Sequence, residues 1–101
     1  MITFITTNLS RKKDAIKLAK ELLENNLIVC SNINKTTSQY FWKGKYHEEV
    51  EYQASFKTSI QKKEQAIKFI KKQHPYEVPL IASKDLEISN SYKAWMDDIL
   101  S

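Results

Sequence analysis

The six-residue segment HPYEVP, from His74 to Pro79, carries the side chains best suited to chemistry in this sequence. Each proline locks its own φ at about −65° and pushes the residue before it toward an extended conformation, so the segment should form a stiff corner. An imidazole and a carboxylate, here His74 and Glu77, are metal ligands, and with Tyr76 they could also act as general acids or bases. The structural alternative is that Pro75 only ends a helix and Pro79 only opens an edge strand.

The other candidate metal ligands are scattered along the chain. The sequence has one cysteine, Cys30, and one further histidine, His47, beside an expected hairpin turn. No C-x-x-C or H-x-x-x-H spacing occurs, so spacing alone does not predict a metal site within one chain. Cys30 is interpreted first as a buried structural thiol and second as a ligand, since free cysteine is among the most buried residues. A site assembled between subunits stays open.

Neither catalysis nor nucleic-acid binding is predicted. Arg11 is in a suitable place for an acylphosphatase-like site, but residues 7–10 contain no glycine to bring the backbone against a phosphate. The consecutive aromatic residues 40–42 must alternate between the two faces of a strand, and no glycine-rich RNP signature accompanies them. We therefore expect these aromatic side chains to serve core and interface packing.

Composition indicates one ordinary globular domain over residues 1–101, with 42% hydrophobic and 28% charged residues. The net charge of +4 comes from 16 Lys and Arg against 12 Asp and Glu, and the basic residues are dispersed. A single cysteine cannot form an internal disulfide, and no apolar stretch approaches the about 20 residues of a membrane span. We expect a cytoplasmic protein without membrane or nucleic-acid partners.

Four strands are predicted from short apolar or alternating segments. Residues 2–7 suit a strand buried on both faces, and residues 27–42 suit a long strand with an irregular middle. After a turn around Gly44, alternation over residues 49–57 predicts a half-buried strand paired with the preceding one. The fourth strand is expected over residues 78–86. One face of the third strand should be buried: Val50, Tyr52, Ala54 and Phe56.

Three helices are predicted from apolar residues at three- and four-residue spacing. The first should begin after a capping oxygen of Asn8 or Ser10 and end at residues 25–26, because Asn tolerates the left-handed geometry of a helix C-terminus. The second has capping-box spacing over residues 58–61 and must stop before the HPYEVP corner. A short terminal helix follows Ser89. The expected buried positions are Ala15, Leu18, Ala19, Leu22, Leu23, Ala66, Ile67, Phe69, Ile70, Tyr92, Trp95, Met96 and Ile99.

This order, β-α-β-β-α-β and a short helix, predicts an α+β protein with a ferredoxin-like fold, in which two helices cover one face of an antiparallel sheet. The other face and the long aromatic hairpin would expose apolar surface and strand edges, which soluble proteins normally hide. We therefore expect self-association, although composition alone does not give the number of subunits.

Three segments together resemble the CutA family of divalent-cation tolerance proteins: LIVCSNI at 27–33, YFWKGK at 40–45 and HPYEVP at 74–79. The resemblance extends from Thr7-Asn8 to Trp95. It implies a homotrimer of ferredoxin-like βαββαβ subunits whose long hairpins pair across subunits. It also implies a role in tolerance of copper or another divalent cation, by binding rather than catalysis. Two alternatives stay open, a PII-like small-molecule-responsive signalling trimer and a purely structural trimer with empty clefts.

The resemblance places a candidate ligand cleft between subunits at the HPYEVP corner. The candidate ligands for Cu²⁺ or another divalent cation are His74, Glu77 and Cys30. The expected cleft wall consists of Tyr76, Tyr40, Trp42 and Tyr52. CutA-like proteins proposed to bind copper have a cysteine and a histidine pair where this chain has Thr7 and Gln73-His74, so only His74 of that set is present.

Overall fold

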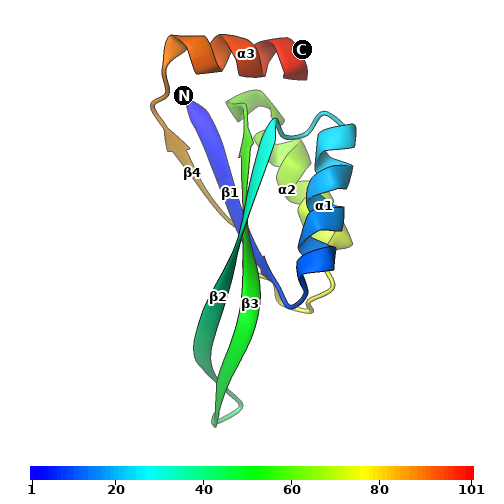
Figure 1. Ribbon diagram of the computed structural model, residues 1–101, viewed down its shortest axis with the longest axis vertical. Coiled ribbons are helices and arrows are strands. Elements are labelled where there is room, and N and C mark those ends of the chain that lie inside the picture. Colours follow the sequence, from blue (N-terminus) through cyan, green and yellow to red (C-terminus); the bar gives the residue numbers. More distant parts are fainter.

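The computed structural model describes residues 1–101 as one antiparallel sheet with three helices (Figure 1). The elements are β1 (Ile2–Leu9), α1 (Lys12–Glu24), β2 (Cys30–Trp42), β3 (Lys45–Thr58), a 3₁₀ turn (Ile60–Lys62), α2 (Lys63–Gln73), β4 (Ala82–Leu86) and α3 (Asn90–Leu100). The strand order is β2-β3-β1-β4. Helices α1 and α2 lie on one side of the sheet, and α3 lies across the end where the chain begins (Figure 1). This is the predicted α+β ferredoxin-like architecture.

The main core fills the space between the sheet and helices α1 and α2. Ile5 and Leu9 of β1 and Phe56 of β3 belong to one buried cluster with Leu22 of α1 and Ile70 of α2. Burying one such side chain stabilises a fold by about 1.5–3 kcal/mol. The cluster therefore fixes α2 on the sheet and, with it, the position of the corner that follows α2.

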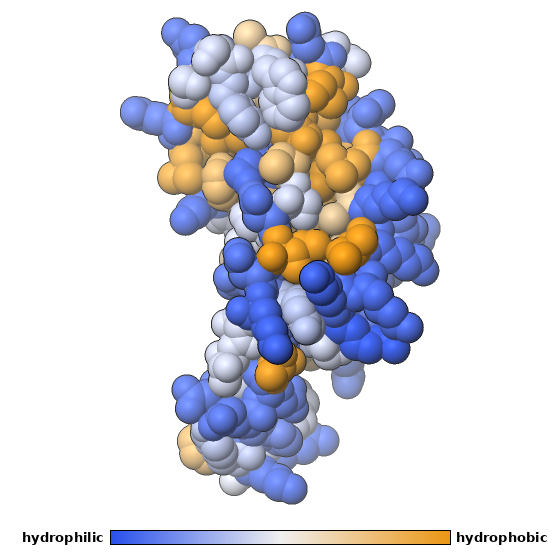
Figure 2. All heavy atoms as spheres, in the orientation of Figure 1, coloured by the Kyte–Doolittle hydropathy of each residue, from blue (hydrophilic) through white to orange (hydrophobic).

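A smaller cluster holds α3 against the beginning of β1. Ile2, Val29, Met96 and Leu100 are buried together there. Trp95 and Ile99, which were predicted to be buried, are exposed in the single chain, because α3 packs along one side only. Leu23 of α1 is also exposed, against prediction. Figure 2 shows apolar surface exposed on the body of the molecule below α3. The single chain therefore has exposed apolar surface, as the sequence predicted.

Strands β2 and β3 form a long two-stranded ribbon that extends beyond the rest of the sheet (Figure 1). Pairing is uninterrupted from Cys30 opposite Lys57 to Trp42 opposite Lys45, so the predicted irregular middle is wrong. Lys43 and Gly44 form the turn with φ of 52° and 75°. Positive φ at both central residues is what a two-residue type I′ turn requires, and it matches the twist of the paired strands.

The strand boundaries differ from the prediction, most clearly at the starts of β2 and β4. Residues 27–29 are buried in the connection from α1, and β2 begins only at Cys30. β4 begins at Ala82 rather than at residue 78. The carbonyl of Leu80 accepts a hydrogen bond from the Thr7 hydroxyl at 2.7 Å, so this part of the chain bonds to a side chain of β1 instead of extending the backbone ladder.

Two predicted helix starts are wrong by a few residues. Asn8 still belongs to β1, and α1 is preceded by Arg11, which makes no side-chain cap hydrogen bond; neither Asn8 nor Ser10 caps the helix. The second helical segment is capped by Ser59 instead of Thr58. The Thr58 hydroxyl donates instead to the carbonyl oxygen of Leu27, in the buried connection before β2, at 2.7 Å. A tertiary contact thus takes the hydroxyl that the capping-box pattern assigned to a cap.

The predicted C-terminal ends of α1 and α2 and the predicted N-terminal cap of α3 are confirmed. Asn26 has φ of 54° after α1, in the left-handed region that asparagine tolerates. Helix α2 ends at Gln73, and His74 is extended with φ of −68° and ψ of 132°, as a residue before a proline should be. Ser89 caps α3 by accepting a hydrogen bond from a backbone N–H.

Candidate functional site

His74 anchors the HPYEVP corner through both of its ring nitrogens. Nε2 lies 2.9 Å from Thr7 Oγ1 and 3.0 Å from the carbonyl oxygen of Asn8, and Nδ1 accepts a hydrogen bond from the Tyr76 N–H at 3.1 Å. The proton must be on Nε2, because Nδ1 is an acceptor and the Thr7 hydroxyl already donates to Leu80. The ring therefore ties the corner to the end of β1.

The environment of His74 keeps the ring neutral. The side chain is buried, with 8% of the residue exposed. Burial lowers its pKa, although the hydrogen bond to the Asn8 backbone and the charge of Glu51 act in the opposite direction. A neutral ring with Nε2–H donated and Nδ1 occupied has no free lone pair for a metal ion. Within one chain, His74 is a structural residue.

The three predicted metal ligands do not come together in the chain. Cys30 begins β2 and packs against the small cluster beneath α3, whereas His74 lies beside Asn8 at the other end of β1. Glu77 faces a pocket at the corner. No group of three or more His, Cys, Asp or Glu side chains is arranged to hold a metal ion. The residues of one chain therefore do not fit the copper site predicted from these three ligands.

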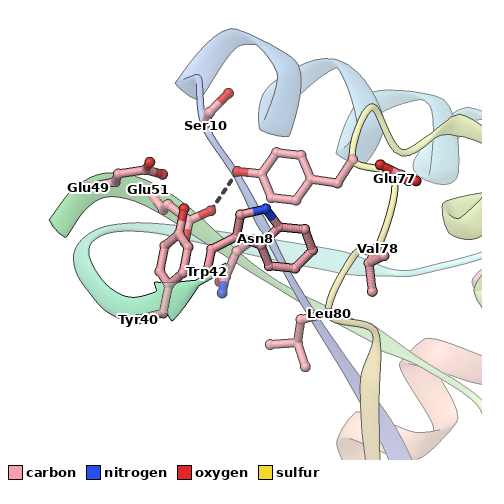
Figure 3. A pocket seen from close by; sticks show the side chains of 10 residues that line it. Asn8, Ser10, Tyr40, Trp42, Glu49, Glu51, Glu77, Val78 and Leu80 are labelled. Carbon is pink, nitrogen blue, oxygen red and sulfur yellow. Dashed lines mark hydrogen bonds between the residues drawn. The ribbon is translucent and has the colours of Figure 1, made fainter. Parts of the chain in front are cut away.

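A pocket of about 590 Å³, here called the hairpin pocket, opens between the ribbon, the end of β1 and the HPYEVP corner (Figure 3). Its wall has three aromatic rings, Tyr40, Trp42 and Tyr76, and three carboxylates, Glu49, Glu51 and Glu77. The remainder of the wall is Asn8, Ser10, Val78 and Leu80. Three of the four predicted wall residues and one predicted ligand are thus brought to a single site.

Tyr52, the fourth predicted wall residue, does not line the hairpin pocket. Its side chain packs against the main core on the helix side of the sheet. Neighbouring residues of a strand face opposite sides, so the side chains that point into the pocket are those of Glu49 and Glu51. Val50 is on the same side as Tyr52 but is 50% exposed, against prediction, because the ribbon has already passed the end of the helices.

Glu51 is, with Glu49, one of the charged pocket residues that the sequence analysis did not indicate. Only 8% of it is exposed, and its Oε2 accepts a hydrogen bond from the Tyr76 hydroxyl at 2.5 Å (Figure 3). Burial and the bond to the Glu51 carboxylate raise the pKa of Tyr76, so its hydroxyl keeps its proton at neutral pH. The Tyr76 ring also meets the His74 ring edge-on, with centroids 4.8 Å apart. Tyr76 therefore connects the corner to the ribbon.

The chain is an α+β protein of the ferredoxin-like class, with a long β2–β3 ribbon and a pocket beside that ribbon. The model of the family described as CutA1 divalent ion tolerance protein matches residues 3–99. The chain is 40% identical to the divalent-cation tolerance protein CutA of Thermococcus kodakarensis over 89 residues, which are 87% of this chain and 86% of that protein. The chain belongs to the CutA1 divalent ion tolerance protein family.

Solved structures agree with this assignment over the whole fold. CutA1 from Ehrlichia chaffeensis superposes with a TM-score of 0.95 at 30% identity, covering 99% of this chain and 95% of that one. The protein from Archaeoglobus fulgidus, described as a periplasmic divalent cation tolerance protein, superposes with a TM-score of 0.93 at 28% identity over 100% of both chains. In the present chain, no helix has the length and apolar character needed to cross a bilayer.

Proposed function

We propose that this protein serves divalent-cation tolerance by binding a ligand in the hairpin pocket, without catalysing a reaction, as a homotrimer in the cytoplasm. The observation that carries the proposal is the pocket of about 590 Å³ whose wall contains three carboxylates and three aromatic rings. Its volume is within the range of about 300–1,000 Å³ typical of small-ligand sites. The tolerance role comes from the family, and the location is compatible with a single cysteine that needs no oxidising compartment.

The state of the polar side chains supports binding rather than catalysis. A general base needs a free lone pair within reach of a substrate proton. Both nitrogens of His74 are occupied by Thr7, Asn8 and the Tyr76 backbone. The Tyr76 hydroxyl is held by Glu51, and its raised pKa makes it a poor proton donor. These groups maintain the shape of the pocket instead.

The ribbon supports self-association. Phe41 is 74% exposed and Val50 is 50% exposed, although both are large apolar residues outside the hairpin pocket. β2 is an edge strand, and one side of its backbone therefore lacks a partner in the single chain. A second copy of the chain would cover both features, and three copies are what the sequence resemblance implies. Light scattering should give three times the chain mass of 11.8 kDa, whereas a stable 11.8 kDa species would contradict the homotrimer.

Direct binding of Cu²⁺ or another divalent cation is a separate part of the proposal. His74 and Cys30 are not available at the hairpin pocket, so Glu77 and its neighbouring carboxylates are the ligands that remain from the predicted set. These carboxylates do not form a metal site by themselves. We therefore propose that any such site takes further ligands from a second subunit.

Calorimetric titration of the purified oligomer with Cu²⁺ and Zn²⁺ tests this part. A Glu77→Gln variant should bind the cation more weakly than the wild type, and Cys30→Ser, which lies outside the pocket, should bind it with unchanged affinity. Glu64→Gln, an exposed carboxylate on α2, is the matched control. A loss of binding in Cys30→Ser alone would make Cys30 a ligand and contradict the assignment.

A PII-like role as a small-molecule-responsive trimer is the second candidate, favoured by the aromatic wall of the hairpin pocket. A ligand that binds only the folded protein raises Tm. A thermal-shift screen with divalent cations, nucleotides and amines therefore separates the candidates by which class stabilises the protein. Stabilisation by no compound would support a purely structural trimer and contradict a ligand-binding function.

A further inference from the structure

We propose that the hairpin pocket binds a small organic cation carrying an aliphatic ammonium group. This assignment rests on the proposed function, because it takes the hairpin pocket as the ligand site, and it adds the chemical class of the ligand. Three features of the wall support it: the sign of its charge, one buried carboxylate without a cationic partner, and the aromatic rings.

The charge of the pocket wall is opposite to that of the chain. The wall contains three glutamates and no Lys, Arg or His, although the chain as a whole carries +4. The ion pairs of the structure include neither Glu51 nor Glu77, and Glu49 is paired only with His47, at 3.7 Å. A ligand that enters the pocket therefore meets negative charge that the protein does not neutralise with lysine or arginine.

Glu51 points most directly to a cationic ligand. More than nine-tenths of the residue is buried, and its carboxylate has the Tyr76 hydroxyl as a partner but no lysine or arginine. A buried carboxylate normally has a cationic partner, since removing the charged group from water costs on the order of several kcal/mol. The side chain faces a cavity, so a bound ammonium group would supply the missing positive charge.

The aromatic rings distinguish an organic cation from a bare metal ion. The rings of Trp42 and Tyr40 both belong to the pocket wall (Figure 3). The faces of Trp and Tyr attract an alkylated cation within about 6 Å, by about 0.5–2 kcal/mol for each favourable contact. Rings do not ligate Cu²⁺ or Zn²⁺, and the carboxylates alone form no metal site. Nucleotides and other anions would be repelled by the same wall.

The test compares charged ligands with an uncharged ligand of the same shape. We suggest choline as the quaternary probe, putrescine as the primary-amine probe and 3,3-dimethyl-1-butanol as the neutral analogue of choline. Thermal shift and calorimetry on the intact oligomer should use an amine-free buffer at constant ionic strength. The expected result is stabilisation by choline or putrescine and none by the neutral alcohol. Binding of choline alone would indicate that the rings dominate the interaction, and binding of putrescine alone would indicate that the carboxylates do.

Two variants and a control make the result specific. Trp42→Leu should weaken choline binding about tenfold, because the best cation-attracting ring is lost. The double variant Glu49→Gln with Glu77→Gln should weaken both probes about tenfold, and it changes only exposed side chains, so folding should be retained. Glu64→Gln on α2 should leave binding unchanged.

Equal stabilisation by choline and its neutral analogue would overturn the proposal, because it would indicate an apolar site without cation selectivity. Stabilisation by divalent cations but by neither ammonium probe would also overturn it, while leaving the proposed function intact. No stabilisation by any of these compounds would overturn the proposal and the proposed function together.

Discussion

Tyr76 donates its hydroxyl hydrogen to Oε2 of Glu51 at 2.5 Å, joining the corner after α2 to the base of the ribbon. The two residues are 25 positions apart in the sequence, and both line the hairpin pocket. This bond sets the separation of two walls that belong to different elements. The shape of the pocket therefore depends on it as much as on the backbone.

Replacing Tyr76 with Phe should lower the free energy of unfolding by about 1–3 kcal/mol, because a buried carboxylate oxygen loses its donor. Urea denaturation at fixed protein concentration measures the effect. Tyr46→Phe is the matched control, since the Tyr46 hydroxyl donates to Glu48 at 2.8 Å in an exposed part of the ribbon. Its loss should change stability by about 0.5 kcal/mol or less. Equal effects of the two variants would contradict the structural importance of the Tyr76 bond.

Replacing Thr7 with Val should also destabilise the protein by about 1–3 kcal/mol. The Thr7 hydroxyl is fully buried, accepts from His74 and donates to the carbonyl of Leu80, which would be left without a partner. Thr6→Val is the control, because Thr6 lies in the same strand but faces the opposite side of the sheet and is only partly buried. Thermal unfolding would contradict the prediction if both variants lowered Tm equally.

The lowered pKa of His74 predicts a specific pH dependence of stability. Above the ordinary value of about 6.5, the ring is neutral in both the folded and unfolded states and stability is unaffected. Below about 6.5, the unfolded chain binds a proton that the folded chain does not. The free energy of unfolding should therefore decrease as the pH is lowered, by at most about 1.4 kcal/mol per pH unit, until the pKa of His74 in the folded state is reached.

Denaturant unfolding from pH 8 to pH 5.5 measures this dependence. In a His74→Gln variant the component due to this side chain should disappear, so its stability should fall less steeply than that of the wild type below about pH 6.5. The variant can retain a donor toward Asn8 but has no titrating ring. Parallel curves for the two proteins would contradict a neutral, buried His74.

Replacing Gly44 with Ala should destabilise the hairpin by about 1–2 kcal/mol, since φ of 75° is unfavourable for a residue with a Cβ. An added Cβ would meet no atom within 4 Å, so the cost is one of backbone conformation only. Gly44→Asn should cost less, because asparagine tolerates this region. Urea unfolding of both variants checks the order, and an alanine variant as stable as the asparagine variant would contradict it.

The sequence predicts the fold well where a local pattern determines it. Alternation after Gly44 identifies the third strand, and Pro75 sets the end of α2. The start of β4 is wrong because the Thr7 hydroxyl takes the Leu80 carbonyl, a contact between residues 73 positions apart. No local pattern contains such a contact.

The site is only partly predictable for the same reason. Tyr40, Trp42 and Tyr76 stand out as aromatic residues, and they do line the hairpin pocket. Glu51 does not stand out, because a glutamate in an alternating strand is normally assigned to solvent. The burial of Glu51 depends on Tyr76, which belongs to the distant corner. The prediction that Tyr52 lines the pocket was wrong, because Tyr52 faces the opposite side of the sheet.

The ribbon has a mechanical consequence. β1 pairs with β3 only up to Leu9 opposite Tyr52, so residues 45–51 of β3 have β2 as their only strand partner, like a cantilever clamped at one end. At about 3.4 Å per residue this arm is roughly 23 Å long, and a tilt of about 5° at the clamp moves the tip by about 2 Å. Because Glu51 is beside the clamp, a small displacement there is magnified at Gly44 and transmitted to whatever touches the tip.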